Sequence, residues 1–328
     1  MSICILGDLH FNSSKDYYVQ VGEEFIKWFH GWVKNDPENE LILAGDLVNT
    51  SIDGGIVIDQ LVKMFNLSRF SKVHIVVGNH DIKRKDGIEQ LAYKFLRQRE
   101  NIAIYEREQV VKIQGKQVLL LPHYNPTTSE ESMSKRYSKL HEIYDGLDLT
   151  VGHFAEERYG GFGSDKIKNI EKLDTKYLCL GHIHIRTNPK IYIGSVYSTR
   201  VGEQDDRRAA WVLDSDGKLT FDRLPVFCDF VTVEYPNPLP STPAEVPVYT
   251  ITNCSSDKIA RLQYGDSIFI RKTLRGLDAK KVIGDKGVQR LGLQDLDVKS
   301  LFKVFLKEYP GSLDRSAAAI CQRLLTTN

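Results

Sequence analysis

Five apolar segments of this chain each end at a glycine that is followed directly by Asp, Asn or His. A short apolar run that stops at a turn residue predicts a buried β-strand. Because the carboxyl ends of strands in an open α/β sheet border the crevice where ligands bind, we expect the polar residues to lie together. The segments are Ser2–Leu6, Leu41–Ala44, Val73–Val77, Asp148–Val151 and Tyr177–Leu180.

The residues after these strands are candidate metal ligands. A single Gly-Asp is usually a turn, and a single histidine usually lies in the core or on the surface, but five such sites in one chain favour a shared centre. All the donors are oxygen or imidazole, which suits Mn²⁺, Mg²⁺, Fe²⁺ or Zn²⁺, and they are too many for one small cation. We therefore predict two divalent ions held by Asp8, His10, Asp46, Asn79, His153, His182 and His184.

The order of these motifs resembles the calcineurin-like metallophosphoesterases, whose pattern is Asp-x-His, Gly-Asp, Gly-Asn-His-Asp/Glu, Gly-His and Gly-His-x-His. All five motifs are present here in that order. The resemblance implies that one ion is held by Asp8, His10 and His184, that the other is held by Asn79, His153 and His182, and that Asp46 bridges the two.

The resemblance also implies two catalytic residues in the turn Gly78 to Asp81. His80 would protonate the leaving oxygen or stabilise the transition state, and Asp81 would orient the ring of His80. The alternative is that His80 is a structural residue of the turn. His123 also follows a predicted strand, and for it we favour a structural role.

The alternation of predicted strands and helices indicates an α/β protein. Two mixed sheets flanked by helices would form the α/β/β/α sandwich of the metallophosphoesterases. The predicted helices cover Val19 to Asn35, Ile56 to Phe65, Gly87 to Gln98 and Glu130 to Tyr144. Short strands at Lys190 to Ile193, Ala209 to Leu213 and Leu219 to Leu224 would complete the second sheet, with a hairpin turn at Asp214 to Gly217. The glycine-rich Arg158 to Ser164 lacks the Gly-Lys-Ser/Thr of a phosphate-binding loop.

The length of 328 residues allows a large core and a smaller appendage. We expect a phosphoesterase domain at residues 1–225 and a β-rich cap at 226–280. Within the cap we expect strands at Phe230 to Glu234, Val248 to Ile251 and Ser267 to Lys272. Residues 281–328 would form a helical segment.

Charge and cysteine content limit the function and the compartment. Lys and Arg number 44 and Asp and Glu 43, for a net charge of +1, so nucleic-acid binding would need local patches or a partner. The five cysteines lack a C-x-x-C spacing, and a free thiol in an apolar strand packs as a small apolar side chain. With no apolar leader and no stretch of about 18 apolar residues, we expect a cytoplasmic protein without a membrane span, in the host cytoplasm if it is phage-encoded.

Within the superfamily the chain is most similar to the SbcD-type DNA double-strand-break repair nucleases. The likeness extends to about residue 225 and includes Tyr192 to Thr199 followed by Gly202-Glu203. It implies a Mn²⁺-dependent exo/endonuclease that works as a homodimer with an SbcC-type coiled-coil ATPase. One departure is Leu47 to Thr50, where many relatives carry a histidine that is absent here.

The same resemblance implies that the cap at 226–280 binds DNA and that the helical segment at 281–328 docks the ATPase. An exposed cation cluster is more often solvated surface than a binding site. The DNA candidates are Lys83, Arg84, Lys85, Arg207 and Arg208, followed by Arg271, Lys272 and Arg275. The apolar stripe Leu301, Phe302, Phe305 and Leu306 would dock the ATPase, although a helix packed on its own domain would show the same stripe.

Two other functions are compatible with these motifs. One is a freestanding phosphatase or cyclic-nucleotide phosphodiesterase on the same fold, which would differ from a nuclease in the size of its substrate. The other is a scaffold without metal, which the complete ligand set disfavours.

Overall fold

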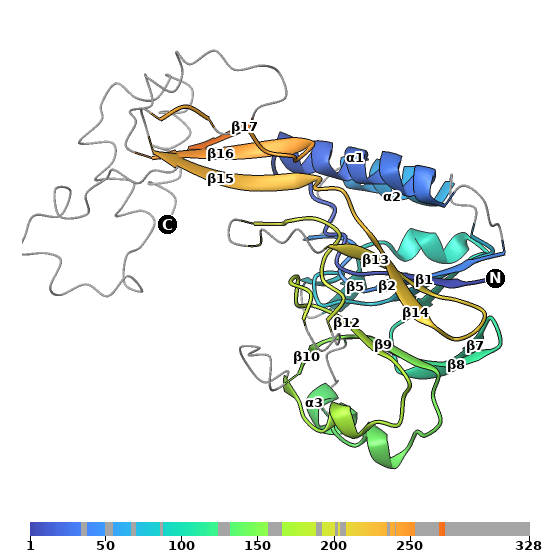
Figure 1. Cartoon of the computed structure of the whole chain (residues 1–328). Helices are drawn as coiled ribbons and strands as arrows, with labels where there is room; N and C mark the ends of the chain where they lie inside the picture. Colours follow the sequence, from blue (N-terminus) through green and yellow to red (C-terminus); the bar gives the residue numbers. More distant parts are fainter. Residues whose placement is uncertain are drawn as a thin grey trace, which may run out of the picture.

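The computed structural model describes most of the chain up to residue 272. The described residues are 1–33, 38–49, 55–66, 70–85, 88–123, 132–156, 166–187, 192–200, 203, 208–234, 237–239, 241–252 and 269–272. Figure 1 shows two sheets with helices α1 and α2 lying along one side.

The first sheet has six strands in the order β14-β13-β1-β2-β3-β6. Strands β1, β2, β3 and β6 run parallel, while β13 is antiparallel to both β1 and β14. The carboxyl ends of β1, β2 and β3 therefore lie at one edge, directly before three of the predicted ligand turns. The strands are β1 (Ile3–Leu6), β2 (Glu40–Ala44), β3 (Lys72–Val76), β6 (Ile102–Tyr105), β13 (Ala209–Leu213) and β14 (Leu219–Arg223).

The second sheet has four strands in the order β12-β9-β8-β7. Strands β8, β9 and β12 are parallel, and β7 pairs with β8 in an antiparallel hairpin. Strands β9 and β12 end at the remaining ligand turns, so this sheet supplies the second half of the centre. The strands are β7 (Gln109–Ile113), β8 (Lys116–Leu121), β9 (Leu149–His153) and β12 (Leu178–Gly181).

Alternating side chains of the strands fill three separate cores. In β1, Ile3 and Ile5 pack between the sheets, while Cys4 and Leu6 pack under helices α1 (Asp16–Trp32) and α2 (Gly55–Asn66). On the far side of the second sheet, Leu119 and Leu121 pack against α3 (Met133–Tyr137) and the 3₁₀ segments η2 (Leu140–Glu142) and η4 (Ile170–Lys172). The order helix, sheet, sheet, helix is the predicted α/β/β/α arrangement with mixed sheets.

A third, parallel sheet follows the sandwich and packs on its first helix. It consists of β15 (Cys228–Glu234), β16 (Val246–Thr252) and β17 (Phe269–Lys272). Phe230 of β15 contacts Tyr17 of α1 with ring centroids 6.0 Å apart, and it belongs to the same core as α1. Burial of these apolar side chains fixes the sheet to the sandwich.

The predicted helix at Gly87 to Gln98 is wrong. Its described part forms strand β5 (Ile88–Leu91), which pairs antiparallel with β4 (Ile82–Lys85), and then the 3₁₀ segment η1 (Lys94–Gln98). Ile88 and Leu91 fit a helical stripe equally well, but pairing with the strand that follows the metal turn decides the outcome.

Two further predictions need correction. The helix expected over Glu130 to Tyr144 is reduced to α3 and η2, because a thin apolar stripe gives a longer helix little to bury. Strands β13 and β14 complete the first sheet and not the second. The hairpin turn between them is as predicted, with Gly217 at a positive φ of 74°.

Several predicted features lie partly or wholly outside the described residues. Of the strand expected at Lys190 to Ile193, Tyr192 forms an isolated bridge with Leu180. Two small parallel strands, β10 (Ala155–Glu156) and β11 (Lys166–Ile167), lie on either side of the glycine-rich segment, which is not described. The helical segment at 281–328 is also outside. In the described part of the chain, no helix combines the length and the apolar character needed to cross a membrane.

Candidate metal centre

The backbone at the strand ends is bent so that side chains turn into one crevice. Four of the six non-glycine residues with positive φ in the described chain are predicted ligands: Asp8 (51°), His10 (46°), Asp46 (50°) and His182 (84°). Left-handed backbone is unfavourable for residues with a side chain and is concentrated at functional sites. The fold therefore accepts local strain to bring these donors together.

Two glycines allow the turns to pack against one another. A Cβ on Gly78 would lie 2.2 Å from Oδ1 of Asp46, and a Cβ on Gly45 would lie 2.2 Å from Nδ1 of His153. Gly45 also has a φ of 86°, which favours glycine. Gly45 and Gly78 thus each make room for a predicted ligand from a neighbouring strand.

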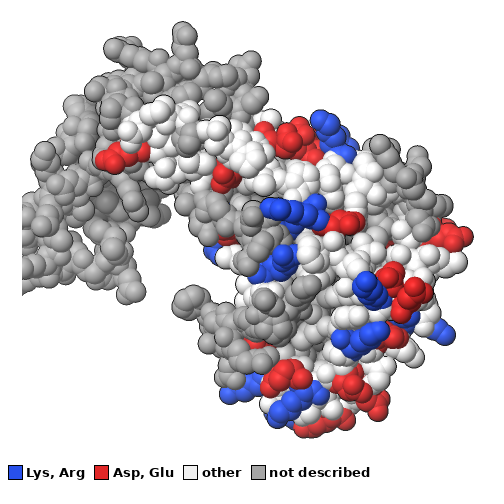
Figure 2. Space-filling model, in the orientation of Figure 1, with Lys and Arg blue, Asp and Glu red and all other residues white. Residues whose placement is uncertain are grey.

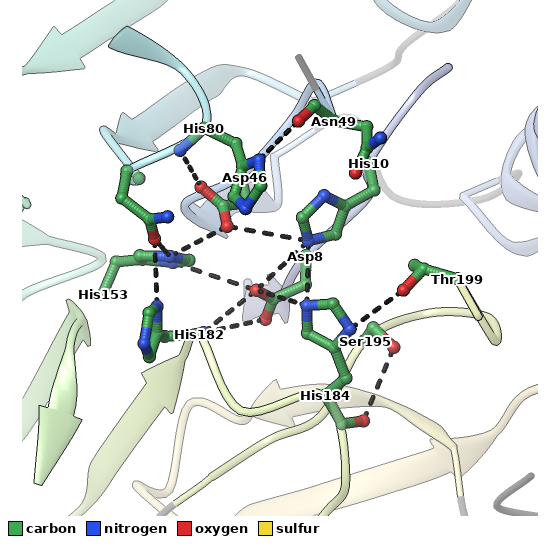
Figure 3. A network of polar contacts seen from close by, with 12 residues as sticks. Asp8, His10, Asp46, Asn49, His80, His153, His182, His184, Ser195 and Thr199 are labelled. Atoms are coloured by element: carbon green, nitrogen blue, oxygen red, sulfur yellow. Dashed lines mark hydrogen bonds and ion pairs between the residues drawn. The ribbon is translucent and has the colours of Figure 1, made fainter. Parts of the chain in front are cut away.

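The donors form two groups that meet at one carboxylate oxygen. The first group is Asp8, His10 and His184, and the second is Asp46, His153 and His182; within each, the ligand atoms lie within 4.8 Å of one another. Oδ2 of Asp46 is 3.1 Å from Nε2 of His153 and 3.6 Å from Nε2 of His10. Figure 3 shows this oxygen between the two groups. Asp46 is therefore placed to bridge two cations.

Asn79 joins the second group through its side-chain oxygen. Oδ1 of Asn79 lies 2.9 Å from Nδ1 of His182 and 3.0 Å from Nε2 of His153. The structure thus brings together all the predicted ligands, and it does so in the predicted grouping. A neutral amide adds an oxygen donor without a further negative charge.

Burial and the two carboxylates set the electrostatics of the centre. Burial lowers the pKa of His10 and of His182 to about 3, so both imidazoles are neutral at pH 7 and can offer a lone pair. Burial also acts against a charge on His153, but Asp46 and Asp8 outweigh it and raise the pKa of His153 to about 10. Burial would raise the pKa of Asp46, yet His153 and His10 hold it below its ordinary value.

These properties fit divalent cations. Among the described residues, the ion pairs of Asp8 and Asp46 are all with histidines, and no lysine or arginine neutralises the two carboxylates. The field that favours a proton on His153 equally favours a cation beside it. Carboxylate, imidazole and amide donors at this density suit Mn²⁺, Zn²⁺, Fe²⁺ or Mg²⁺.

His80 lies at the open side of the centre. Its side chain is exposed, and its ring centroid is 5.1 Å from that of His10. Its Nδ1 contacts the backbone carbonyl of Asn49, while its backbone N–H donates to Oδ1 of Asp46 at 2.8 Å. Asn49 therefore orients the ring and leaves Nε2 for a substrate.

The expected role of Asp81 needs correction, because Asp81 does not contact the ring of His80. Its buried carboxylate accepts hydrogen bonds from the backbone N–H groups of Leu47 (2.9 Å), Val48 (3.3 Å) and Gly78 (2.8 Å). Asp81 thus joins the loop after Asp46 to the loop after β3. It supports the centre and does not touch the site of reaction.

Arg208 also differs from the expectation that it faces DNA. It is 5% exposed, and its guanidinium donates to the carbonyl oxygens of Glu203 (2.6 Å) and Ser195 (2.9 Å). Lys83 is exposed on β4, close in sequence to His80. The remaining cations and the apolar stripe have side chains outside the described residues: Arg84, Lys85, Arg207, Arg271, Lys272, Arg275, Leu301, Phe302, Phe305 and Leu306.

Three residues around the ligands had no assigned role from the sequence. Glu203 accepts a hydrogen bond from His184, Thr199 contacts both of these residues, and Asn49 orients His80. Gly202-Glu203 stands out only as part of the family likeness. No spacing rule connects it to a ligand, since the contact is made across a loop.

One family model and several solved structures are similar to this chain. Residues 1–186 match the family model described as calcineurin-like phosphoesterase, and no curated protein matches the chain. Solved structures with similarity include the protein of unknown function AQ665 from Aquifex aeolicus, at 16% identity and a TM-score of 0.29, covering 54% of this chain and 88% of that one. Another is the phosphopantetheinyl hydrolase PptH from Mycobacterium tuberculosis, at 13% identity and a TM-score of 0.32, covering 59% and 89%.

The matched residues contain every ligand described above, from Asp8 to His184. The paired ligand groups provide what hydrolysis of a phosphoester by two metal ions requires. The chain belongs to the calcineurin-like phosphoesterase family, whose model matches residues 1–186.

Proposed function

We propose that this protein is a DNA exo/endonuclease that uses two divalent cations, with Mn²⁺ as the favoured ion. The observation that carries the proposal is Oδ2 of Asp46, which lies within 3.6 Å of a histidine from each ligand group. When bound, two cations at such a site polarise phosphate oxygens and activate water for in-line attack.

Four residues of the site would have distinct roles in hydrolysis: Asp46, Asn79, His80 and Asn49. The charge of Asp46 is shared by the two groups, and Asn79 adds a donor that does not repel phosphate. As the water oxygen attacks phosphorus and the bond to the leaving oxygen breaks, the imidazolium form of His80 would donate its Nε2 proton to that oxygen and become the neutral imidazole with its proton on Nδ1. The contact of Nδ1 with Asn49 keeps the ring in one orientation for this transfer.

The choice of DNA as substrate rests on two features near the centre. The β4–β5 hairpin begins directly after Asp81 and carries the exposed Lys83. The segment Tyr192 to Thr199, which resembles that of the SbcD-type nucleases, lies against His184: the N–H of Ser195 donates to its carbonyl oxygen at 3.0 Å. In Figure 2, Lys and Arg are interspersed with Asp and Glu on the visible face. Because the charges on this face are mixed, individual side chains near the centre, and not a broad positive surface, would have to hold the DNA.

The proposal includes a cytoplasmic complex with an SbcC-type ATPase, in which two copies of this chain take part. Residues 298–328 would provide the docking segment. Deletion of these residues should keep metal-dependent hydrolysis and abolish co-purification with the ATPase. Retained association would contradict the docking role.

The test is hydrolysis of end-labelled duplex DNA in the presence of Mn²⁺, with and without the ATPase and ATP. The expected result is release of nucleotides or short fragments by the wild-type protein and not by an Asp46→Asn variant. Bis(p-nitrophenyl) phosphate and a cyclic nucleotide serve as small substrates in parallel. If only the small substrates are cleaved under every metal condition, the protein is a small-molecule phosphodiesterase instead.

A further inference from the structure

His184 is a ligand whose second ring nitrogen contacts a carboxylate. Its Nε2 lies 2.9 Å from Nε2 of His10 and 3.9 Å from Oδ1 of Asp8, so this nitrogen faces the first ligand group. Its Nδ1 lies 2.8 Å from Oε1 of Glu203. An imidazole that binds a metal through Nε2 carries its proton on Nδ1, and Glu203 is placed to accept that proton's hydrogen bond.

The carboxylate of Glu203 is itself held in one orientation. Glu203 is 4% exposed. Oε2 accepts hydrogen bonds from the backbone N–H of Thr199 (2.9 Å) and from its hydroxyl (2.8 Å), while Oε1 also accepts from Nε of Arg200 (2.7 Å). Both oxygens are occupied, so the carboxylate cannot rotate without breaking several hydrogen bonds.

The backbone of Glu203 is fixed to that of His184 by Arg208. One end of the guanidinium donates to the carbonyl oxygen of Glu203 at 2.6 Å, and the other reaches the carbonyl oxygen of His184 at 3.4 Å. The hydroxyl of Ser198 adds a third contact, to the Glu203 carbonyl at 3.1 Å. The guanidinium of Arg208 thus connects the backbone of Glu203 to the backbone of His184.

The other histidines of the centre are supported differently. Nδ1 of His153 contacts the backbone carbonyl of Ala44 at 2.8 Å. Nδ1 of His10 is buried and has no hydrogen-bond partner among the described residues. Of these three histidines, only His184 has a carboxylate within hydrogen-bond distance of its Nδ1, since the carboxylate near Nδ1 of His153, that of Asp8, lies at 4.0 Å. A carboxylate in this position makes the other ring nitrogen a stronger donor to a cation.

We propose that Glu203 is a positioning residue of the metal centre: it fixes the tautomer and the orientation of His184 and thereby sets the affinity of the Asp8, His10 and His184 site for its cation. Loss of a carboxylate behind a metal-binding histidine typically weakens metal binding about 10- to 100-fold. The inference rests on the metal-binding part of the proposed function and is independent of the substrate.

The experiment is calorimetric titration of metal-stripped protein with Mn²⁺, which needs no substrate and so separates this inference from the nuclease activity. Glu203→Ala should weaken one of two binding events about 10- to 100-fold and leave the other in place. Glu203→Gln retains an acceptor for Nδ1–H without the charge, and it should lie between Ala and wild type.

The matched control is Glu40→Gln. Oε2 of Glu40 lies 2.7 Å from Nε2 of His74 in the first sheet, so this variant alters a similar histidine–carboxylate pair that is not part of the metal centre. It should bind Mn²⁺ as wild type does. Unchanged binding by Glu203→Ala, or an equal loss in Glu40→Gln, would overturn the proposal.

A spectroscopic measurement covers the case in which Glu203→Ala does not fold. The ¹⁵N shifts of His184 in labelled, metal-stripped protein should indicate a proton on Nδ1 in the wild type and a mixture of tautomers in Glu203→Gln. His74 provides the internal reference. Identical His184 shifts in the two proteins would contradict a positioning role.

Discussion

The backbone N–H of His80 donates a hydrogen bond of 2.8 Å to Oδ1 of Asp46, the residue whose other oxygen faces both ligand groups. The carboxylate of Asp46 would therefore help to hold two cations through Oδ2, and it accepts a hydrogen bond from the proposed proton donor through Oδ1. Positions of the acid and of the metals are coupled through a single side chain, so a substitution at Asp46 disturbs both.

Replacement of Asp46 by Asn should impair both sites. The amide retains the shape of the side chain, but it lacks the charge that attracts cations to His10 and His153. We expect fewer than two Mn²⁺ per chain by elemental analysis and a loss of phosphodiesterase activity of about 100-fold or more. Full occupancy of both sites in Asp46→Asn would contradict the bridging role.

Replacement of His80 by Ala should separate binding from catalysis. His80 is exposed and contributes no predicted ligand atom, so both cations should remain. Loss of a general acid typically lowers kcat about 10²- to 10⁴-fold. Hydrolysis of bis(p-nitrophenyl) phosphate and metal content measured on the same sample check this. Loss of metal would mean that His80 is itself a ligand.

Replacement of Asp81 by Asn should act on stability. In asparagine an NH₂ group replaces one of the two oxygens that accept hydrogen bonds from Leu47, Val48 and Gly78. Because the NH₂ group cannot accept, at least one hydrogen bond is lost, and losing a hydrogen bond to a charged group lowers the free energy of unfolding by about 1.5–3 kcal/mol. We expect a lower melting temperature and little change in the pH profile of kcat. A shifted profile at unchanged stability would instead indicate that Asp81 acts on His80.

Two glycine substitutions test the close packing of the turns. Gly78→Ala places a Cβ 2.3 Å from the backbone nitrogen of Asp46, so the backbone must shift; overpacking of this kind costs about 1–3 kcal/mol. Gly31→Ala in α1 meets no atom within 4 Å and should stabilise the chain by about 0.5–1 kcal/mol. Denaturation in EDTA measures both. Equal effects would contradict a special role of Gly78.

The free energy of unfolding should depend on pH because His74 is buried. Its Nε2 lies 2.7 Å from Glu40, its Nδ1 lies 2.8 Å from the hydroxyl of Tyr105, and burial lowers its pKa below the ordinary 6.5. With the lower pKa in the folded state, the unfolded chain takes up the proton first, so stability is full above pH 6.5 and is lost as the pH falls through the folded-state pKa.

His74→Gln should reduce the fall in melting temperature between about pH 7 and pH 5, because glutamine does not titrate. The measurement is made in EDTA on both proteins, so that the metal ligands contribute equally to each curve. A constant difference between the two proteins over this range would contradict the assignment.

The ligands were predictable from the sequence because each follows a strand that ends at glycine. This local pattern, repeated along the chain, identifies Asp8 or His153 without any knowledge of the contacts between them. The parallel pairing of β1, β2 and β3 then brings their turns to one edge.

Other features depend on contacts that no local pattern encodes. Glu203 reaches His184 across a loop, and Arg208 is buried by the same loop although its residue type favours the surface. Asp81 follows His80 directly, but adjacent residues in a turn point in different directions. The helix expected over Gly87 to Gln98 is absent from the described residues because Ile88–Leu91 pairs with another strand, a contact that the local sequence pattern does not encode.

Strand β13 lies beside β1 in the middle of the first sheet, with Leu213 paired to Ile3. Strand β1 therefore lacks one of its two neighbours until β13 has been synthesised, and such distant pairing slows folding. A fragment ending at residue 186, where the family match stops, would possess every metal ligand and yet expose β1 as a bare edge prone to aggregation. The shortest soluble catalytic fragment should therefore extend through β14.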